Sequence, residues 1–169
     1  MNIFLDIRRQ ASGTGCAGIN LNHVFRILCL LVPCVLCPVS WSSFAADVSP
    51  RVCFKDTCYE VEIARSPGEQ EHGLMGRDSL PAGRGMLFIF AKQYHYGFWM
   101  KNMKFSIDIL WLDDAKKVVH IAKSVPPCTK DPCPVYIPQY VARYVVEIPS
   151  GDAANKKIKL SDQAIFQGQ

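Results

Sequence analysis

The sequence lacks any complete catalytic or metal-binding signature. Its histidines are scattered without the spacing of metal ligands, and no serine stands in a recognisable nucleophile context. Enzymes and metalloproteins bring such groups together as a catalytic set or a ligand set, and none can be assembled from these residues. We therefore predict no cofactor and no bound metal, and we favour a protein without enzymatic activity.

A long apolar run is also missing. The uncharged apolar stretch 27–39 has thirteen residues, whereas a membrane-spanning helix needs about 20. It follows Arg26 and precedes Ser43 and Ala45, which are small residues suited to cleavage after Ala45. We predict a signal peptide at 1–45, with the remaining chain periplasmic or secreted. The alternative is an uncleaved inner-membrane anchor, and membrane contact would then be through this segment only.

No strong excess of one charge is present. The chain has nineteen Lys and Arg against fifteen Asp and Glu, which gives a net charge of +4. Residues 1–45 contribute +2 to this net charge, because they contain three arginines and one aspartate. Nucleic-acid binding usually requires a concentrated basic surface. We therefore predict no nucleic-acid partner.

Cysteine usage is consistent with export. Four of the eight cysteines lie in residues 1–45, and the others are Cys53, Cys58, Cys128 and Cys133, two pairs of equal spacing. Four cysteines allow three connectivities. A two-residue turn would place Cys53 opposite Cys58 on a hairpin, and Cys128 and Cys133 bound a proline-containing loop. We predict a disulfide within each pair, with a four-thiolate zinc site as the alternative.

Short apolar runs separated by turns predict a mainly β chain. Ser66, Pro67 and Glu69 have the pattern of a helix start, namely a cap, a first-turn proline and an acid three residues after the cap. The expected strands are a hairpin at 52–63 and runs at 86–90, 96–101, 105–112, 117–123, 142–148 and 157–160, with loops at 92–96 and 126–138. This pattern predicts one domain, 46–169, built as a small antiparallel barrel or sandwich with one short helix.

The stretch 97–108 mixes aromatic, thioether, basic, amide and acidic side chains between two apolar runs. Asp108 lies among apolar neighbours, and a buried carboxylate must be paired or neutral. Arg77 and Lys101 are its expected partners. Asp108 is then either an acid or base with a shifted pKa in a cleft, or half of a structural salt bridge that fixes strand register.

The same stretch contains a possible binding platform. On a strand, Trp99 and Lys101 would point to one side and Met100 and Asn102 to the other. An indole beside a cation could hold a sugar or an anionic group. The alternative is an amphipathic strand whose lysine extends its charged end into solvent.

Methionine offers a minor third possibility, a site for cuprous copper. Thioethers are suitable ligands for this ion, and the candidates are Met75, Met86, Met100 and Met103, with His95 nearby in sequence. Only two of these methionines are close together in the chain. Methionine as a filler of the core is the interpretation that we prefer.

Several blocks in order resemble a known family. They are Gly73 to Arg77, Gly85 to Phe90, Phe98 to Asn102, Ile107 to Ile109, Val125 to Cys133 and Ala142 to Glu147. Together they resemble the uncharacterised bacterial and archaeal family known as domain of unknown function 192, over residues 58–166. The resemblance implies a small exported β-rich domain with no established activity, and it suggests that the cysteines around residues 129–132 are a recurrent loop feature. Many members have proline where this chain has Ser106.

The leading functional hypothesis is a non-enzymatic exported module that binds a small molecule, an envelope glycan or a protein. Asp108 would hold the cation of the binding face in place. The predicted binding residues are Arg77, Trp99, Lys101, Asn102 and Asp108. The alternatives are a hydrolase-like enzyme with Asp108 or Glu147 as general base, and the cuprous-ion carrier.

Overall fold

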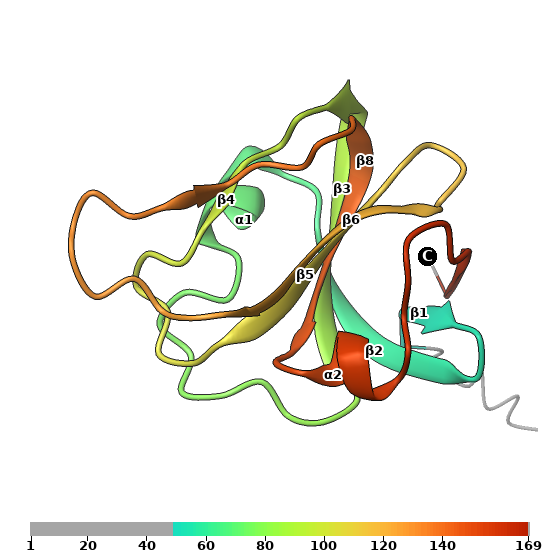
Figure 1. Ribbon diagram of the computed structural model, residues 1–169, viewed down its shortest axis with the longest axis horizontal. Coiled ribbons are helices and arrows are strands. Elements are labelled where there is room, and N and C mark those ends of the chain that lie inside the picture. The colour runs from blue at the N-terminus through green and yellow to red at the C-terminus, as the bar shows by residue number, and fades with distance from the viewer. Residues whose placement is uncertain (1–48, 169) are drawn as a thin grey trace, which may run out of the picture. The chain divides into compact units, whose positions relative to one another are not determined.

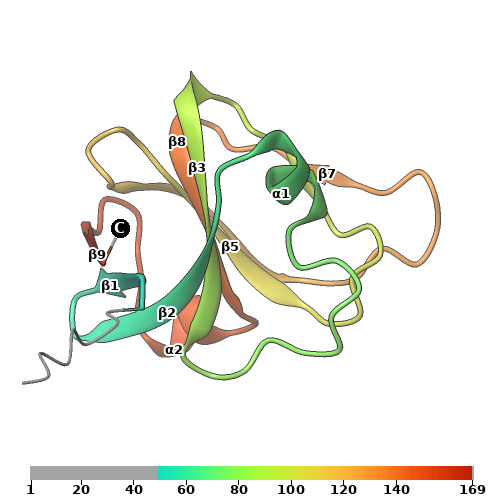
Figure 2. The same ribbon diagram turned by 180° about the vertical axis from the view of Figure 1, so that it is seen from behind.

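The computed structural model describes residues 49–168 (Figures 1 and 2). The predicted signal segment 1–45, the alternative anchor and the boundary at residue 46 lie outside these residues. Within the described range, neither helix has the length and apolar character needed to cross a membrane.

The described residues form nine strands and two short helices. In chain order they are β1 (Arg51–Phe54), β2 (Thr57–Ala64), α1 (Pro67–His72), β3 (Arg84–Tyr94), β4 (Phe98–Trp99), β5 (Ile107–Leu112), β6 (Val118–Val125), β7 (Val135–Tyr136), β8 (Ala142–Pro149), α2 (Asp152–Asn155) and β9 (Ala164–Gln167). The chain is therefore mainly β, as the sequence predicts.

Seven strands form one sheet in the order β6-β5-β8-β3-β2-β1-β9, and β4 pairs with β7 in a separate two-stranded sheet. The large sheet curls into a half-barrel (Figure 1). Its edges approach each other through backbone hydrogen bonds between the start of β6 and the segment before β9, as in Val118 N to Asp162 O at 3.0 Å. Neighbouring strands are antiparallel except β2 and β3, which run parallel.

The two faces of the sheet carry two separate apolar clusters, because successive side chains of a strand point to opposite faces. The cluster inside the curl includes Phe54, Leu110 and Ile148. The cluster on the outer face includes Trp111 and Phe88 and is covered by the α1 and β4–β7 regions (Figure 2). Strand β5 contributes to both clusters, and all six of its residues are buried.

The first hairpin and the first helix follow the sequence closely. Cys53 and Cys58 are directly opposed across β1 and β2, and their sulfur atoms are 2.06 Å apart. Ser66 caps α1, because its hydroxyl accepts a hydrogen bond from the amide of Glu69 while the Glu69 carboxylate accepts from the amide of Ser66. The predicted capping box is confirmed.

Other boundaries predicted from the sequence are wrong. Strand β3 extends to Tyr94, into the expected loop at 92–96, because Tyr94 pairs with Ala142 after an irregularity in the ladder. The expected strand 96–101 shortens to β4, whose partner β7 lies within the expected loop 126–138. The expected last strand 157–160 is a turn, and the true last strand is β9. A second helix, α2, precedes that turn and was too short to leave a periodic pattern.

Candidate functional site

The two acids proposed as catalytic bases, Asp108 and Glu147, occupy neighbouring strands but opposite faces of the sheet. Strands β5 and β8 are in register with Asp108 opposite Ile148 and Ile109 opposite Glu147. Ile148 belongs to the inner cluster, and Ile109 belongs to the outer one. Each acid therefore has a different environment, and they cannot act as a pair.

Asp108 serves a structural purpose. Its side chain is fully buried, and its carboxylate accepts hydrogen bonds from the backbone amides of Ser124 at 2.7 Å, Gly151 at 3.1 Å and Ala153 at 2.7 Å. These donors give both oxygens of the buried carboxyl group hydrogen-bond partners. The expected partners Arg77 and Lys101 are wrong, because Arg77 binds Glu62 and Lys101 lies 3.6 Å from Asp131.

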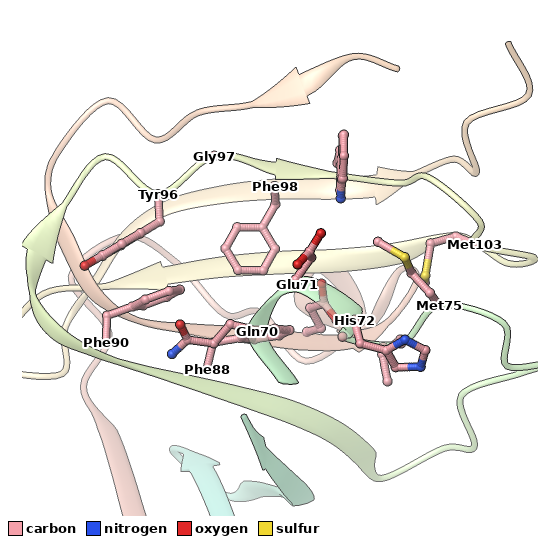
Figure 3. Close-up of a pocket in the computed structure, with 14 residues that line it drawn as sticks. Gln70, Glu71, His72, Met75, Phe88, Phe90, Tyr96, Gly97, Phe98 and Met103 are labelled. Carbon is pink, nitrogen blue, oxygen red and sulfur yellow. The ribbon is translucent and has the colours of Figure 1, made fainter. Parts of the chain in front are cut away.

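The outer face contains a cavity of about 240 Å³ between α1 and β4. Aromatic rings and thioethers supply much of its wall (Figure 3). Its lining side chains include Gln70, Glu71, His72, Leu74, Met75, Phe88, Phe90, Tyr96, Phe98, Trp99, Met103 and Glu147. This size approaches the lower end of the range for small-molecule sites.

The cavity walls are held by specific contacts. The rings of Phe88 and Phe98 meet edge to face with centroids 4.9 Å apart, while Phe90 and Tyr96 are stacked. Figure 3 shows these four rings toward one end of the view and the sulfur atoms of Met75 and Met103 toward the other. Such aromatic contacts favour defined ring orientations and help to hold the cavity walls in place.

Helix α1 forms one side of the cavity and is anchored to the sheet by Gln70. The amide of this side chain donates to the carbonyl of Ile89 at 2.9 Å. The helix is followed by Gly73, whose φ of 51° favours glycine, and a Cβ there would lie 3.3 Å from the ring of Phe88. The close approach of the chain to Phe88 thus depends on glycine.

Glu147 is the buried acid of the cavity. Its side chain is only 6% exposed, and its Oε2 atom has no hydrogen-bond partner among the described residues. Burial raises the pKa of the Glu147 carboxyl to about 8, and the positive charge of Arg77 opposes this shift. Because buried polar groups are nearly always hydrogen-bonded, an unpartnered carboxyl oxygen at a cavity is notable.

Arg77, one of the predicted binding residues, lies outside the cavity. Its guanidinium donates to both carboxylate oxygens of Glu62, with Nη2 2.7 Å from Oε2. This pair raises the pKa of Arg77 and lowers that of Glu62 through their hydrogen bonds. Arg77 borders a different surface hollow with Glu62 and Met86.

The other three predicted residues, Trp99, Lys101 and Asn102, do come together. They line an open groove that adjoins the cavity, because Glu71, His72, Met75 and Trp99 border both spaces. The Lys101 ammonium lies 5.7 Å from the centre of the Trp99 ring. Strand alternation predicted Asn102 on the opposite side from Trp99, but the strand ends at Trp99 and Asn102 adopts a φ of 58° in the following turn.

The second cysteine pair closes the loop beside this groove. The sulfur atoms of Cys128 and Cys133 are 2.09 Å apart, and the amide of Cys128 donates to the carbonyl of Met100 at 3.0 Å. Cys128, Cys133 and Asp131 also form the one cluster of potential metal ligands in the described residues. Because the two sulfurs are bonded to each other, they do not offer thiolates to a metal.

The structure divides the four methionines considered as copper ligands. Met86 and Met100 are buried in the outer cluster, as expected for core filling. Met75 and Met103 line the cavity together with His72. His95 is directed elsewhere, since its Nδ1 lies 3.0 Å from the carbonyl oxygen of Pro138.

Sequence reasoning did not find the helix side of this site. From the sequence, Gln70 and Glu71 belong to the predicted start of a helix and His72 is one of the scattered histidines without ligand spacing. Nothing local shows which part of the core they cover. The apolar run 86–90 predicts a strand, and nothing in it shows that Phe88 and Phe90 line a cavity. Glu147 gave one usable signal, a lone acid within the apolar strand 142–148, and it was considered only as a general base.

Comparison with known proteins places the chain in a family. A family model for domain of unknown function 192, described as "Uncharacterized ACR", matches residues 51–166. The chain belongs to this family. A UPF0127 protein of Pyrococcus abyssi is 31% identical over 109 residues, which cover 62% of this chain and 83% of that protein.

Two solved structures resemble this family member. A protein of unknown function from Novosphingobium aromaticivorans is 28% identical with a TM-score of 0.62, covering 69% of this chain and 82% of its own. A protein called a putative transcription regulator, from Sinorhizobium meliloti, is 24% identical with a TM-score of 0.64, covering 71% of this chain and 93% of its own. The second likeness concerns the fold alone.

Proposed function

We propose that this protein is an exported binding module for a small organic molecule, held in the cavity between α1 and β4. The observation that carries the proposal is the carboxyl of Glu147, buried at an aromatic-walled cavity with one oxygen unpartnered in the described part of the chain. Binding sites are typically apolar cavities with a few polar groups that orient the ligand. A ligand would supply the partner that Glu147 lacks.

The adjoining groove would bind the outer part of the same ligand. Trp99 borders both spaces and its side chain is 44% exposed. Lys101 and Asn102 add a cation and an amide at the outer end. This arrangement keeps three of the predicted binding residues and replaces Arg77 and Asp108 with Glu147 and the residues of α1.

Two separate features of the chain support export: its cysteine pairs and its apolar N-terminal stretch. Both cysteine pairs of residues 49–168 lie at disulfide distance, and disulfides persist in oxidising compartments. The apolar stretch 27–39, with small residues before position 46, has the pattern of a signal peptide. Both features are typical of a periplasmic or secreted protein.

A second candidate function is hydrolase-like catalysis with Glu147 as general acid or base. A carboxyl whose pKa is raised to about 8 is near the value suited to proton transfer at neutral pH. Asp108 is not part of this candidate, because backbone amides occupy both of its oxygens. Turnover of ester, amide or glycoside substrates that disappears in Glu147→Gln would favour catalysis, and a flat panel would remove this candidate.

The test of binding is a thermal-shift screen of the purified, oxidised protein. The panel should hold amines, amino acids, sugars, muropeptides, nucleotides and cuprous ion. A ligand at a hundred times its dissociation constant should stabilise the fold by about 2.7 kcal/mol, which is several degrees for a domain of this size. Cuprous ion tests the copper alternative, for which Met75 and Met103 remain as candidates, with His72 in the same cavity wall.

Two matched variants test whether a thermal-shift response comes from binding at this site. Trp99→Ala should weaken a ligand that occupies the cavity and groove. Tyr140→Ala removes another exposed aromatic side chain, 57% accessible, that lines neither space, and it should leave the response unchanged. A silent panel, or a response equal in both variants, would defeat the proposal.

A further inference from the structure

The charges around the cavity indicate what kind of ligand it can hold. Glu71 and Glu147 line it together with His72, and among the described residues no lysine or arginine does so. Arg77 is close enough to influence Glu147, but both carboxylate oxygens of Glu62 already bind its guanidinium. An anionic group placed in the cavity would face two acids without a fixed cation.

The walls favour a cation more than they favour a neutral apolar group. Five aromatic side chains line the cavity, and the negative faces of such rings attract ammonium groups. They are Phe88, Phe90, Tyr96, Phe98 and Trp99. A purely apolar ligand would fill the space but leave the Glu147 oxygen without a hydrogen-bond partner, whereas an ammonium would supply a donor.

We infer that the ligand presents a primary ammonium group on a short apolar stem, with the ammonium bound by Glu147 and the stem between the aromatic rings. This inference rests on the proposed binding function and specifies its ligand class. A primary ammonium has three N–H donors and no acceptor, so it suits a site with two carboxyl groups. The cavity volume of about 240 Å³ limits the enclosed part to a small head and stem. Larger substituents would extend into the groove beside Trp99 and Lys101.

The protonation of Glu147 gives this inference a distinctive pH dependence. Burial raises its pKa to about 8, so at lower pH an ammonium ligand must displace the carboxyl proton. The dissociation constant should therefore fall nearly tenfold from pH 6 to pH 7 and about fivefold from pH 7 to pH 8, then level off. A neutral ligand that accepts a hydrogen bond from protonated Glu147 would show the opposite trend.

Other ionisable groups face the same space and must be separated from Glu147. Glu71 and His72 come from α1, Tyr96 precedes β4, and Arg77 follows α1 paired with Glu62. All of these remain in a Glu147→Gln variant, which keeps the size of the side chain. The part of the pH dependence that disappears in this variant therefore belongs to Glu147.

The experiment is calorimetric titration of the purified protein with benzylamine and with benzyl alcohol at pH 6, 7, 8 and 9. Benzylamine remains largely protonated up to pH 8 and has nearly the shape of benzyl alcohol. We expect benzylamine to bind at least tenfold more tightly at pH 8, with the pH trend given above. Glu147→Gln should remove both the preference and most of the trend. Glu60→Gln, which changes a partly exposed carboxylate of β2 that is paired with Arg84 and lies outside the cavity lining, should keep both.

Equal affinity for the two compounds, or affinity that falls with rising pH, would overturn the ammonium assignment while leaving the binding function standing. So would a thermal-shift response confined to molecules that lack an amine. If neither compound binds and the whole panel is silent, the binding function fails, and the ammonium inference fails with it. The wild-type pH trend also tests the inference without a variant, should Glu147→Gln fold poorly.

Discussion

The Oδ2 atom of Asp108 accepts a hydrogen bond from the amide of Ala153 at 2.7 Å and so ties β5 to the first turn of α2. The other carboxylate oxygen accepts from Ser124 on β6 and from Gly151 just before the helix. One buried carboxylate thus connects three segments that are far apart in sequence. Its role is to hold β5, the end of β6 and the start of α2 together, on the face of the sheet opposite to the cavity.

Asp108→Asn should destabilise the fold by at least about 2 kcal/mol. An amide nitrogen would replace one acceptor oxygen and leave a backbone N–H facing another donor. Urea unfolding measures the loss. Asp78→Asn is the control, because its side chain is 92% exposed and its ion pair with Lys104 should contribute less than about 1 kcal/mol. Equal effects of the two substitutions would contradict the structural role of Asp108.

Glu147 should make the free energy of unfolding depend on pH. Its folded pKa is raised to about 8 from an ordinary value of 4.5. As the pH rises, the unfolded chain therefore loses the Glu147 proton before the folded protein does. The contribution of this group to the free energy of unfolding is complete below pH 4.5. It declines by about 1.4 kcal/mol per pH unit as the pH rises toward 8, then levels off.

The measurement is urea unfolding of wild type and Glu147→Gln at pH 5.5, 6.5 and 7.5. The free energy of unfolding of wild type should fall relative to that of Glu147→Gln as the pH rises, because glutamine does not titrate. Parallel pH curves would mean that Glu147 is already ionised in the folded protein at neutral pH. In that case an ammonium ligand would have no proton to displace from Glu147, and the predicted pH trend of ligand binding would disappear.

Gly85 should tolerate no side chain. A Cβ at this position would lie 2.6 Å from the carbonyl oxygen of Glu147 on the adjacent strand. Gly85→Ala should therefore cost about 1–3 kcal/mol through displacement of β3 from β8. Gly68→Ala is a matched control in α1, with no neighbour within 4 Å, and should be neutral or stabilising by up to about 1 kcal/mol. Thermal unfolding compares them, and a neutral Gly85→Ala would contradict the strand spacing.

The two cysteine pairs should each stabilise the fold. Both close loops with a sequence separation of five, for which the loss of unfolded-state entropy is worth about 2 kcal/mol. Replacing both members of one pair by alanine should lower the free energy of unfolding by about this amount. Peptide mapping without reductant should find residues 53 and 58, and residues 128 and 133, linked locally. Any cross-linking between the pairs would contradict this pairing.

The parts of the fold that depend on local sequence were predicted well. The capping box of Ser66 and Glu69 and the cysteine hairpin of Cys53 and Cys58 each involve residues a few positions apart. The predicted strands 105–112 and 142–148 differ from β5 and β8 by at most two residues at one end, because both stretches are mostly apolar. Predictions failed where a segment depends on distant partners, as in β4, which pairs with β7 over two residues only.

The sequence by itself determined the β-rich class, the start of α1 and the local opposition of Cys53 and Cys58, because hydrogen bonds and turns between near neighbours specify them. Only the tertiary structure decided which acid meets a cavity. Asp108 and Glu147 both lie in apolar strands, and the sequence treats them alike. The register of β5 against β8, together with the curl of the sheet, turns Asp108 toward backbone amides and Glu147 toward the aromatic cavity.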